Sequence, residues 1–499
     1  MPLDTLKEIP ITSRNGYDYF PATESFLQKY LSQTTINNWK KLKEKHENIY
    51  VNPNLRPYQK EGAQKIIKNK AFAIFDEQRL GKTPMLLAAL KEIPNLGTTL
   101  IIAPKSTLGS WKKECEKWYT NSVAIASGTK EQRLKIYQKM QPKVILASYK
   151  TIYLDEKYLP EINCIVIDEA HRLRNYKGQR SKYSPISVKK IMQIAYRCER
   201  RYVLTGTPAA NKSENIFPIL HLLYPTLFTS YYKFLDYYYV QDIKFLNKAK
   251  TKHIVEVKNF RKGKQIELQE FLNDISVQRK RKDYMEWLPK VDKKEIYLKL
   301  PEKEEIWYNE LRETYECEEL GIECPNLLSL LTALRKLTTI SEVKKEWVLN
   351  YIEDYPDEQI MIVSEFTSHL KELHKIIKGS KLLIGDTKTE ERTKLEQDFN
   401  NYKYKILLAN ITVAKEGMKL EQCNTIIMLD SSLTYTDNLQ LEDRLLPTTR
   451  EVAVYKQKQQ IIKLLIEDTI DIIIHNQLEN KATYVDIVNN FKEFLKTHT

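Results

Sequence analysis

Residues 71–83 have the types and the order that can bind a nucleotide phosphate. An apolar, strand-like segment ends at a polar turn that closes with Gly81, Lys82 and Thr83, and a helical pattern follows. In a phosphate-binding loop of this kind, backbone N–H groups and the lysine ammonium face the phosphates, and the threonine hydroxyl holds Mg²⁺. Asp76 stands where the usual pattern has its first glycine. An ordinary strand-to-helix turn is therefore the alternative.

A second apolar strand ends in two carboxylates, within the sequence IVIDEAH of residues 165–171. Asp168 at the strand tip is suited to bind Mg²⁺ through one of its waters, and Glu169 is suited to orient or deprotonate an attacking water. For an Asp-Glu pair by itself, a solvated acidic turn is the alternative. Together with the Gly-Lys-Thr loop, the pair predicts a site that hydrolyses a nucleoside triphosphate.

The size and charge of the chain limit the kinds of protein it can be. Its 499 residues exceed the length at which a single hydrophobic core stops growing, so at least two domains are expected. Lysine and arginine number 79 against 65 aspartate and glutamate residues, a net charge of +14 that favours a polyanionic partner such as nucleic acid. A basic surface that only aids solubility is the alternative.

The cysteines and the apolar runs predict a cytoplasmic protein. The six cysteines include no Cys-x-x-Cys pair, and Cys164 and Cys423 lie in or beside apolar strands, so we expect reduced, mostly buried thiols and no zinc site. No apolar run approaches the roughly 20 residues that span a bilayer. The first residues also lack the apolar core of a signal peptide. Neither membrane insertion nor secretion is expected.

Strand and helix patterns alternate from the phosphate loop to about residue 228. The strands are uniformly apolar, as in a parallel sheet covered by helices on both faces, so residues 50–228 predict one doubly wound domain. Ligands of such sheets collect at the carboxyl ends of the strands. The polar residues at those ends are Lys105, Ser106, Ser148, Tyr149 and residues 205–208. Upstream, Gln59 lies near the start of a predicted helix, and its amide suits the edge of adenine.

Six segments occur in the order and spacing of one enzyme family: LRPYQ, DEQRLGKT, LIIAPKSTLGSWKKE, ILASYKTI, VIDEAHRLRN and RYVLTGTPAANKSENIFPILHLLYPTLF. With these segments the chain resembles the Swi/Snf-type ATPases of helicase superfamily two. The resemblance implies an α/β fold with two RecA-like parallel-sheet lobes in tandem, a helical insertion and C-terminal helices. It also implies ATP and Mg²⁺ as cofactors and a motor that moves along double-stranded DNA, usually without separating the strands.

The resemblance also implies roles for particular residues, in these segments and in later ones. Nucleotide contacts are expected from Arg56, Gln59, Asp76, Gly81, Lys82, Thr83 and Gly417. DNA contacts are expected from Lys105, Ser106, Trp111, Ser148, Tyr149, Arg279, Lys280, Arg281, Lys282, Ser364, Thr387 and Thr412. Arg79 departs from the family pattern, since it replaces a glycine and adds a bulky cation near the phosphates.

Residues 229–340 break the strand-helix rhythm and are rich in tyrosine, then strongly basic. The family has a helical protrusion here, and VQRKRKDYMEWLPK resembles its "RRxKxxxxxxLP" segment. We expect the tyrosines to be core residues. The basic run of residues 279–282 could hold duplex phosphates or form a solvated helix face, and the first interpretation is slightly favoured.

A second strand-helix series occupies residues 341–460 and predicts a second RecA-like lobe without a phosphate loop of its own. In the family that the chain resembles, ATP is bound between the two lobes. Arg444, with Gln440 one turn before it, is the predicted cation for the γ-phosphate. The family usually has a second arginine where Pro447 stands, and Arg450 is a possible substitute.

The two ends of the chain carry weaker signals. Residues 1–49 predict an accessory element or a packed arm, and residues 461–499 predict brace helices, because residues 461–481 show helical periodicity. We expect a chain close to a bare, monomeric motor, which resembles compact members encoded by phages or mobile elements. Replication, recombination or defence proteins are possible partners.

Two other functions stay open at this point. One is a fork-acting or annealing helicase, with forked DNA as substrate. The other is a DNA-binding scaffold with weak or no ATPase activity, which Arg79 and Pro447 would explain.

Overall fold

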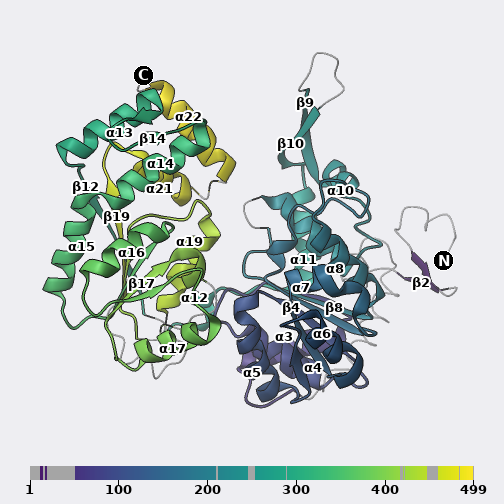
Figure 1. Cartoon of the computed structure of the whole chain (residues 1–499). Coiled ribbons are helices and arrows are strands. Elements are labelled where there is room, and N and C mark those ends of the chain that lie inside the picture. Colours follow the sequence, from purple (N-terminus) through teal and green to yellow (C-terminus); the bar gives the residue numbers. More distant parts are fainter. Residues whose placement is uncertain are drawn as a thin grey trace. The chain divides into compact units, whose positions relative to one another are not determined.

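The computed structural model describes residues 12–14, 17–19, 51–209, 212–245, 253–287, 289–415, 420, 422–446, 459–480, 482 and 484–497 (Figure 1). The chain divides into two compact units, Met1–Tyr284 and Met285–Thr499. In the first 50 residues, the described part is a short antiparallel pair, β1 (Thr12–Arg14) and β2 (Tyr17–Tyr19). Among the described residues, no helix has the length and apolar character needed to cross a membrane.

A seven-stranded parallel sheet forms the frame of the first unit, in the order β11-β3-β8-β7-β4-β6-β5. Every residue of β3, β4 and β6 is buried, as expected for strands covered on both faces. The predicted doubly wound sheet is confirmed. Its strands are β3 (Ala71–Ile74), β4 (Thr99–Ala103), β5 (Val123–Ile125), β6 (Val144–Ser148), β7 (Cys164–Asp168), β8 (Arg200–Leu204) and β11 (Ser276–Val277).

Successive side chains of β3 belong to two separate cores. Ala71 and Ala73 pack into one cluster, and Phe72 and Ile74 into the other. Since side chains alternate along a strand, the two clusters lie on opposite faces of the sheet. One contains α3 (Pro57–Lys68), α4 (Lys82–Lys91) and α5 (Leu108–Trp118), and the other α7 (Tyr149–Asp155), α8 (Ile186–Arg197), α9 (Phe217–Leu223), α10 (Tyr231–Tyr238) and α11 (Lys264–Ile275). In the described part of this unit, the other α-helices are α6 (Lys130–Lys135) and α12 (Arg281–Tyr284).

The predicted helical insertion contains a β-hairpin. Strand β9 (Tyr239–Phe245) pairs antiparallel with β10 (His253–Phe260), and Figure 1 shows the hairpin extending away from the sheet of its unit. The prediction that the tyrosines here are core residues holds for Tyr238 and Tyr239, whereas Tyr232 and Tyr237 are about half exposed. After the hairpin, α11 returns the chain to β11 at the edge of the sheet.

The second unit is built on a six-stranded parallel sheet in the order β12-β19-β18-β15-β17-β16. The predicted tandem of parallel-sheet lobes is therefore confirmed. The strands are β12 (Val291–Leu298), β15 (Ile360–Ser364), β16 (Lys381–Leu383), β17 (Ile406–Asn410), β18 (Thr425–Met428) and β19 (Gln459–Ile466). The helices beside this sheet are α15 (Glu342–Asp354), α16 (Thr367–Ile376), α17 (Thr389–Asn400), α18 (Ile411–Ala414) and α19 (Tyr435–Glu442).

Two strands of this sheet lie in segments that the sequence predicted to be helical, so those predictions were wrong. Residues 461–466 were predicted as helix but belong to β19, so the predicted boundary between residues 460 and 461 falls inside a strand. β12 lies in the predicted helical insertion and pairs with β19 along its whole length. The helix prediction failed because a buried strand and a buried helix segment share a continuous apolar run. A helical prediction does hold for α21 (Ile470–Glu479) and α22 (Tyr484–Thr497).

A separate helical core completes the second unit. Buried residues of α21 and α22 pack with those of α13 (Glu302–Thr314) and α14 (Leu327–Ile340), beside the short hairpin β13 (Glu316–Cys317) and β14 (Ile322–Glu323). The C-terminal helices are thus integral to this unit.

Candidate nucleotide site

The phosphate loop follows β3 and ends where α4 begins at Lys82. Gly81 precedes the helix with φ +76°, in the left-handed region. A Cβ at this position would lie 2.2 Å from Nε2 of Gln59. Glycine is therefore required at position 81 both by the backbone conformation and by the close approach of Gln59.

The start of α3 is bonded to the loop. The Gln59 amide accepts from the N–H of Arg56 at 2.9 Å and donates to the Leu80 carbonyl at 3.0 Å. The Tyr58 hydroxyl donates to the same carbonyl at 3.0 Å. Gln59 therefore holds the loop in place, and its predicted contact with adenine stays a prediction, as does the nucleotide contact of Arg56.

The Lys82 ammonium lies inside the loop that precedes it. It donates to the carbonyl of Asp76 at 2.8 Å and to that of Glu77 at 3.3 Å. Thr83 follows in the first turn of α4 and is partly exposed. An ammonium, a hydroxyl and the N-terminus of a ten-residue helix together form a donor set that fits nucleotide phosphates.

Asp168 ends β7, which is separated from β3 by one strand, β8. One of its oxygens accepts from the Trp111 indole N–H at 2.8 Å, and the other accepts from the N–H of Glu169 at 3.0 Å. Burial and the charge of Glu169 raise the pKa of Asp168 to about 6. A carboxylate held in this way, with the loop hydroxyl of Thr83, is a donor set that suits Mg²⁺.

Glu169 has φ +51° and is oriented by a neighbouring imidazole. Nδ1 of His171 lies 3.2 Å from a Glu169 oxygen and 3.3 Å from the hydroxyl of Thr205, just after β8. Burial raises the pKa of Glu169, but the hydrogen bond and charge of His171, with the charge of Lys82, outweigh burial and lower it. Glu169 is therefore a carboxylate at neutral pH. The role of His171 was missed by sequence reasoning, although VIDEAH contains it.

The comparisons with known proteins agree with this geometry. A family model described as SNF2-related domain matches residues 33–351, well over half of the chain, and one described as helicase conserved C-terminal domain matches residues 343–446. The chain belongs to the SNF2-related family. The predicted Swi/Snf-type resemblance is confirmed, and membership implies an ATPase core that uses ATP.

Relatives of this SNF2-related chain include much longer proteins. It is 34% identical over 206 residues to the ISWI chromatin-remodeling complex ATPase ISW1 of Saccharomyces cerevisiae, covering 38% of this chain and 17% of that protein. It is 24% identical over 552 residues to the nuclear protein STH1/NPS1 of the same yeast, covering 97% of this chain and 39% of that protein. The matches thus span less than two-fifths of these relatives.

A solved structure that the chain resembles is the Sulfolobus solfataricus SWI2/SNF2 ATPase core in complex with dsDNA. The sequences are 22% identical, the TM-score is 0.40, and the match covers 87% of this chain and 92% of that chain.

Four of the predicted DNA contacts of the SNF2-related chain are buried, and their contacts with DNA stay predictions. Trp111 is buried and bonded to Asp168, and Ser148 is buried at the start of α7, where its hydroxyl accepts from the N–H of Thr151 at 3.1 Å. The other two, Arg279 and Ser364, are also buried and bonded to carboxylates of their own unit. Tyr149 is partly buried, and its hydroxyl donates to the Asp168 carbonyl at 2.7 Å.

The other predicted DNA contacts lie at the surface. Lys105, Lys280, Lys282 and Thr412 are exposed, and Ser106, Arg281 and Thr387 are partly exposed. Their contacts with DNA stay predictions.

In the second unit, Gln440 lies in α19 and Arg444 in the short 3-10 helix that follows, η7 (Asp443–Leu445). The Arg444 guanidinium donates to the Lys415 carbonyl, with Nε at 3.1 Å. Lys415 in turn forms an ion pair with Asp437 at 2.5 Å. Gly417, Pro447 and Arg450 lie outside the described residues.

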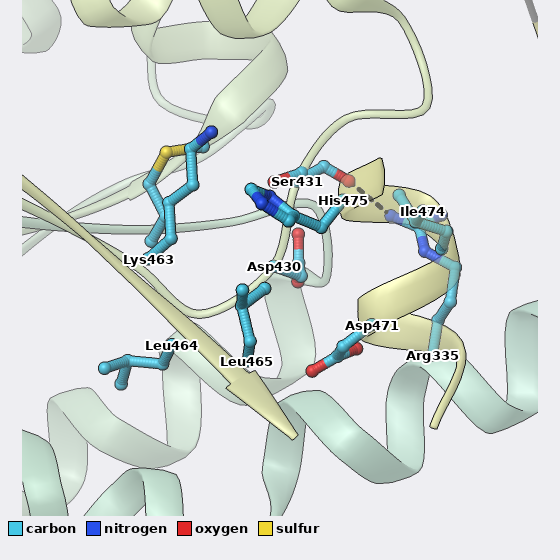
Figure 2. A pocket seen from close by; sticks show the side chains of 10 residues that line it. Arg335, Asp430, Ser431, Lys463, Leu464, Leu465, Asp471, Ile474 and His475 are labelled. Atoms are coloured by element: carbon cyan, nitrogen blue, oxygen red, sulfur yellow. Dashed lines mark hydrogen bonds between the residues drawn. The ribbon is translucent and has the colours of Figure 1, made fainter. Parts of the chain in front are cut away.

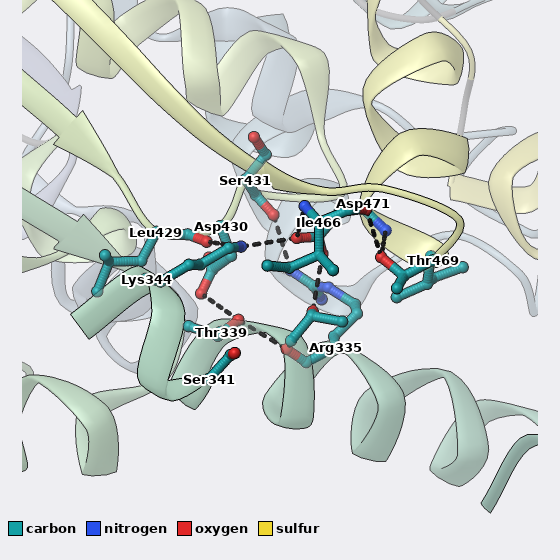
Figure 3. Close-up of polar contacts among 12 residues, drawn as sticks. Arg335, Thr339, Ser341, Lys344, Leu429, Asp430, Ser431, Ile466, Thr469 and Asp471 are labelled. Atoms are coloured by element: carbon teal, nitrogen blue, oxygen red, sulfur yellow. Dashed lines mark hydrogen bonds and ion pairs between the residues drawn. The ribbon is translucent and has the colours of Figure 1, made fainter. Parts of the chain in front are cut away.

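A polar network occupies the carboxyl ends of the central strands of the second unit (Figure 3). Asp430, after β18, accepts from the hydroxyls of Ser364 at 2.6 Å and Thr339 at 3.2 Å. Nearby, the fully buried Lys344 donates to Asp471 at 2.6 Å and to the Leu429 carbonyl at 2.7 Å. These contacts explain why Ser364 faces inward.

A small hollow beside this network is lined by Arg335, Asp430, Ser431, Lys463, Asp471 and His475 among others (Figure 2). The Arg335 guanidinium donates to the Ser431 carbonyl at 2.7 Å. The hollow thus lies between β19 and α21, where Asp471 is already paired with Lys344 and Lys463 with Glu479.

Proposed function

We propose that the protein is an ATP-dependent motor that couples ATP hydrolysis to movement along double-stranded DNA. The observation that supports this proposal most strongly is that the Lys82 loop and the carboxylates of Asp168 and Glu169 follow the carboxyl ends of β3 and β7, two strands of one sheet with only β8 between them. The family assignment and the net charge of +14 support the nucleotide and the polyanionic partner, respectively.

The residues of the first unit have distinct proposed roles. Lys82 neutralises the outer phosphates of ATP, while Thr83 and Asp168 hold Mg²⁺. Bound Mg²⁺ would neutralise charge that develops on the transferred phosphoryl group. Glu169 orients the attacking water and accepts its proton, because its lowered pKa keeps it ionised. His171 fixes the Glu169 carboxylate through the contact at 3.2 Å.

Arg444, with Gln440 nearby on the chain, is the proposed cation for the γ-phosphate in the transition state. In the described structure the Arg444 guanidinium is engaged by the Lys415 carbonyl. Its proposed role therefore includes exchanging that carbonyl for a phosphate oxygen.

The decisive experiment measures phosphate release without nucleic acid and with single-stranded, duplex and forked DNA in parallel. We expect duplex to stimulate hydrolysis more than single strand does. Lys82→Ala should lower the stimulated rate by roughly a hundredfold or more, because a cation at the phosphates is lost. Lys91→Ala, at the exposed end of the same helix, is the matched control and should keep the rate.

Three outcomes would contradict the proposal. A Lys82→Ala protein with the wild-type rate would remove the phosphate loop from the mechanism. DNA binding with negligible stimulated hydrolysis would favour a scaffold. Strand displacement from a fork, without displacement of a triplex-forming strand from duplex, would favour a fork-acting helicase.

A further inference from the structure

A short segment from the end of the first unit runs beside the phosphate loop. We call residues 276–281, which include β11, the strap. The Phe75 N–H donates to the Val277 carbonyl at 2.8 Å, and the Glu77 N–H donates to the Arg279 carbonyl at 3.0 Å. Parallel pairing thus continues beyond β3 into the loop itself. The strap therefore fixes the main chain on both sides of Asp76.

The strap also holds the loop through a buried ion pair. The Arg279 guanidinium lies 3.0 Å from a carboxylate oxygen of Asp76. Asp76 is fully buried and Arg279 is 6% exposed. The second oxygen of Asp76 has no hydrogen-bond partner among the described residues. Without the Arg279 guanidinium, the buried Asp76 carboxylate would lose its paired charge, which is strongly unfavourable.

The space around Arg279 is closed by α3 and α4. A Cβ on Gly62 of α3 would lie 2.2 Å from the sulfur of Met85 and 3.2 Å from Nη1 of Arg279. The Tyr58 ring faces the guanidinium at 5.6 Å, and Glu61 approaches it at 3.4 Å. The guanidinium is therefore enclosed between the two helices that border the phosphate loop.

The two loop residues held by the strap are the ones whose carbonyls hold Lys82. Arg279 binds the carboxylate of Asp76, and the N–H of Arg281 donates to the carboxylate of Glu77 at 2.8 Å. The carbonyls of the same Asp76 and Glu77 accept from the Lys82 ammonium at 2.8 and 3.3 Å. A continuous set of contacts thus leads from the strap to the ammonium.

We propose that Arg279 is a positioning residue for ATP hydrolysis, which holds Asp76 so that the loop presents the Lys82 ammonium to the phosphates. This proposal rests on the proposed ATPase function. It replaces the sequence-based assignment of Arg279 to DNA. The residues of the basic run thus have different positions: Arg279 binds Asp76 of the phosphate loop, whereas its neighbours Lys280 and Lys282 are exposed.

The test compares two arginine–aspartate pairs of the same unit, each with a buried aspartate. Arg279→Met and Asp76→Asn each break the proposed contact, and Arg279→Met/Asp76→Asn removes both charges. Arg133→Met is the matched control, because Arg133 is paired with the buried Asp155 at 2.5 Å and has no contact with the loop. For each variant, kcat and KM for ATP are measured at saturating duplex, and Kd for duplex is measured without nucleotide.

We expect each single variant at the strap to lower kcat per nucleotide-binding site by about tenfold to a hundredfold, because a small displacement of a catalytic cation is costly. Kd for duplex should change less than about twofold, whereas the loss of one contact with a DNA phosphate would change it more. The double variant should be no slower than the slower single variant, since the residues act as a pair. Arg279→Lys should recover part of the rate, and Arg133→Met should keep kcat.

Weakened duplex binding with an unchanged kcat would overturn the proposal and return Arg279 to the DNA contacts. Additive losses in the double variant would also overturn it. If Arg279→Met does not fold, Asp76→Asn and Arg279→Lys decide by the same readouts. If the wild-type protein does not hydrolyse ATP, the proposed function is contradicted instead. Binding of a fluorescent ATP analogue would then test the role of Arg279. We expect weaker binding by Arg279→Lys than by the wild type, and unchanged binding would overturn the proposal for Arg279.

Discussion

The indole of Trp111 shows how a single donor can orient a catalytic group. Its N–H is bonded to one Asp168 oxygen at 2.8 Å, and the Glu169 N–H holds the other oxygen. Trp111 is 3% exposed, so its side chain belongs to the interior rather than to a DNA surface. The orientation of the Asp168 carboxylate, the proposed ligand of Mg²⁺, therefore depends on a residue from α5.

Trp111→Phe should impair metal use without affecting DNA binding. Phenylalanine keeps most of the packing but removes the donor, so Asp168 loses one of its two fixed bonds. We expect about a tenfold rise in the Mg²⁺ concentration that half-saturates hydrolysis, because partners of metal ligands typically matter by that much. Duplex affinity should stay within about twofold. Trp118→Phe, on the same helix, is the control, and a loss of duplex affinity in Trp111→Phe would contradict this assignment.

The sequence predicted the strands and the loop that carry the candidate site better than it predicted which way other side chains point. The loop before Lys82 follows β3, and Asp168 and Glu169 stand at the end of β7, as the local order of apolar strand and polar turn predicted. The direction of Trp111 depends on a partner 57 positions away, and that of Arg279 on one 203 positions away. Such distant pairs leave no local pattern, so both residues were assigned to DNA.

At the scale of elements, one buried ion pair joins α15 to α21. Lys344 is fully buried and lies 2.6 Å from Asp471, and its ammonium also donates to the Leu429 carbonyl beyond β18. Figure 3 shows these residues converging at the strand ends. Because a buried charge without its partner is unfavourable, the pair ties α21 to α15 and to the end of β18.

Lys344→Met should destabilise the second unit by about 3–5 kcal/mol, the usual effect of removing one partner of a buried ion pair. Urea-induced unfolding measured by hydrogen exchange in α15 and β18 would localise the loss. Lys344→Met/Asp471→Asn should recover part of it, because neither charge is then left alone. The adjacent Lys345, whose partner Glu342 is exposed, is the control and should cost at most about 0.5 kcal/mol when changed to Met. Equal effects at 344 and 345 would contradict the inference.

Strand predictions succeeded where burial on both faces gives a plain apolar run, as in β4, β6 and β15. β12 was missed because most of its side chains are exposed at the sheet edge and its sequence, VDKKEIYL, is largely charged. β19 was misread as helix because QQIIKLLI, buried between β12 and β18, has no strand-specific alternation. Pairing with distant strands decides both elements, and such pairing is not visible in the local sequence.

At the scale of the whole molecule, two parallel-sheet units and an excess of basic residues follow from the sequence directly. The net charge of +14 would attract a polyanion such as DNA at long range. The proposed catalytic groups Asp168 and Glu169 differ from this charge, because they are held in short contacts within the first unit. Added salt should therefore weaken DNA association more than it slows ATP hydrolysis on bound DNA.

We expect the apparent duplex affinity, measured from stimulation of hydrolysis, to fall by at least about tenfold between 50 and 200 mM salt, since each neutralised phosphate releases a counterion. The rate at saturating duplex should change less than about twofold over this range, because contacts within the site are poorly screened. Hydrolysis without DNA, measured in the same salt series, is the control for direct effects on nucleotide binding. An affinity that salt leaves unchanged would mean that the basic surface does not contact the phosphates. A parallel fall in the saturated rate would mean that the ions act on the nucleotide site itself.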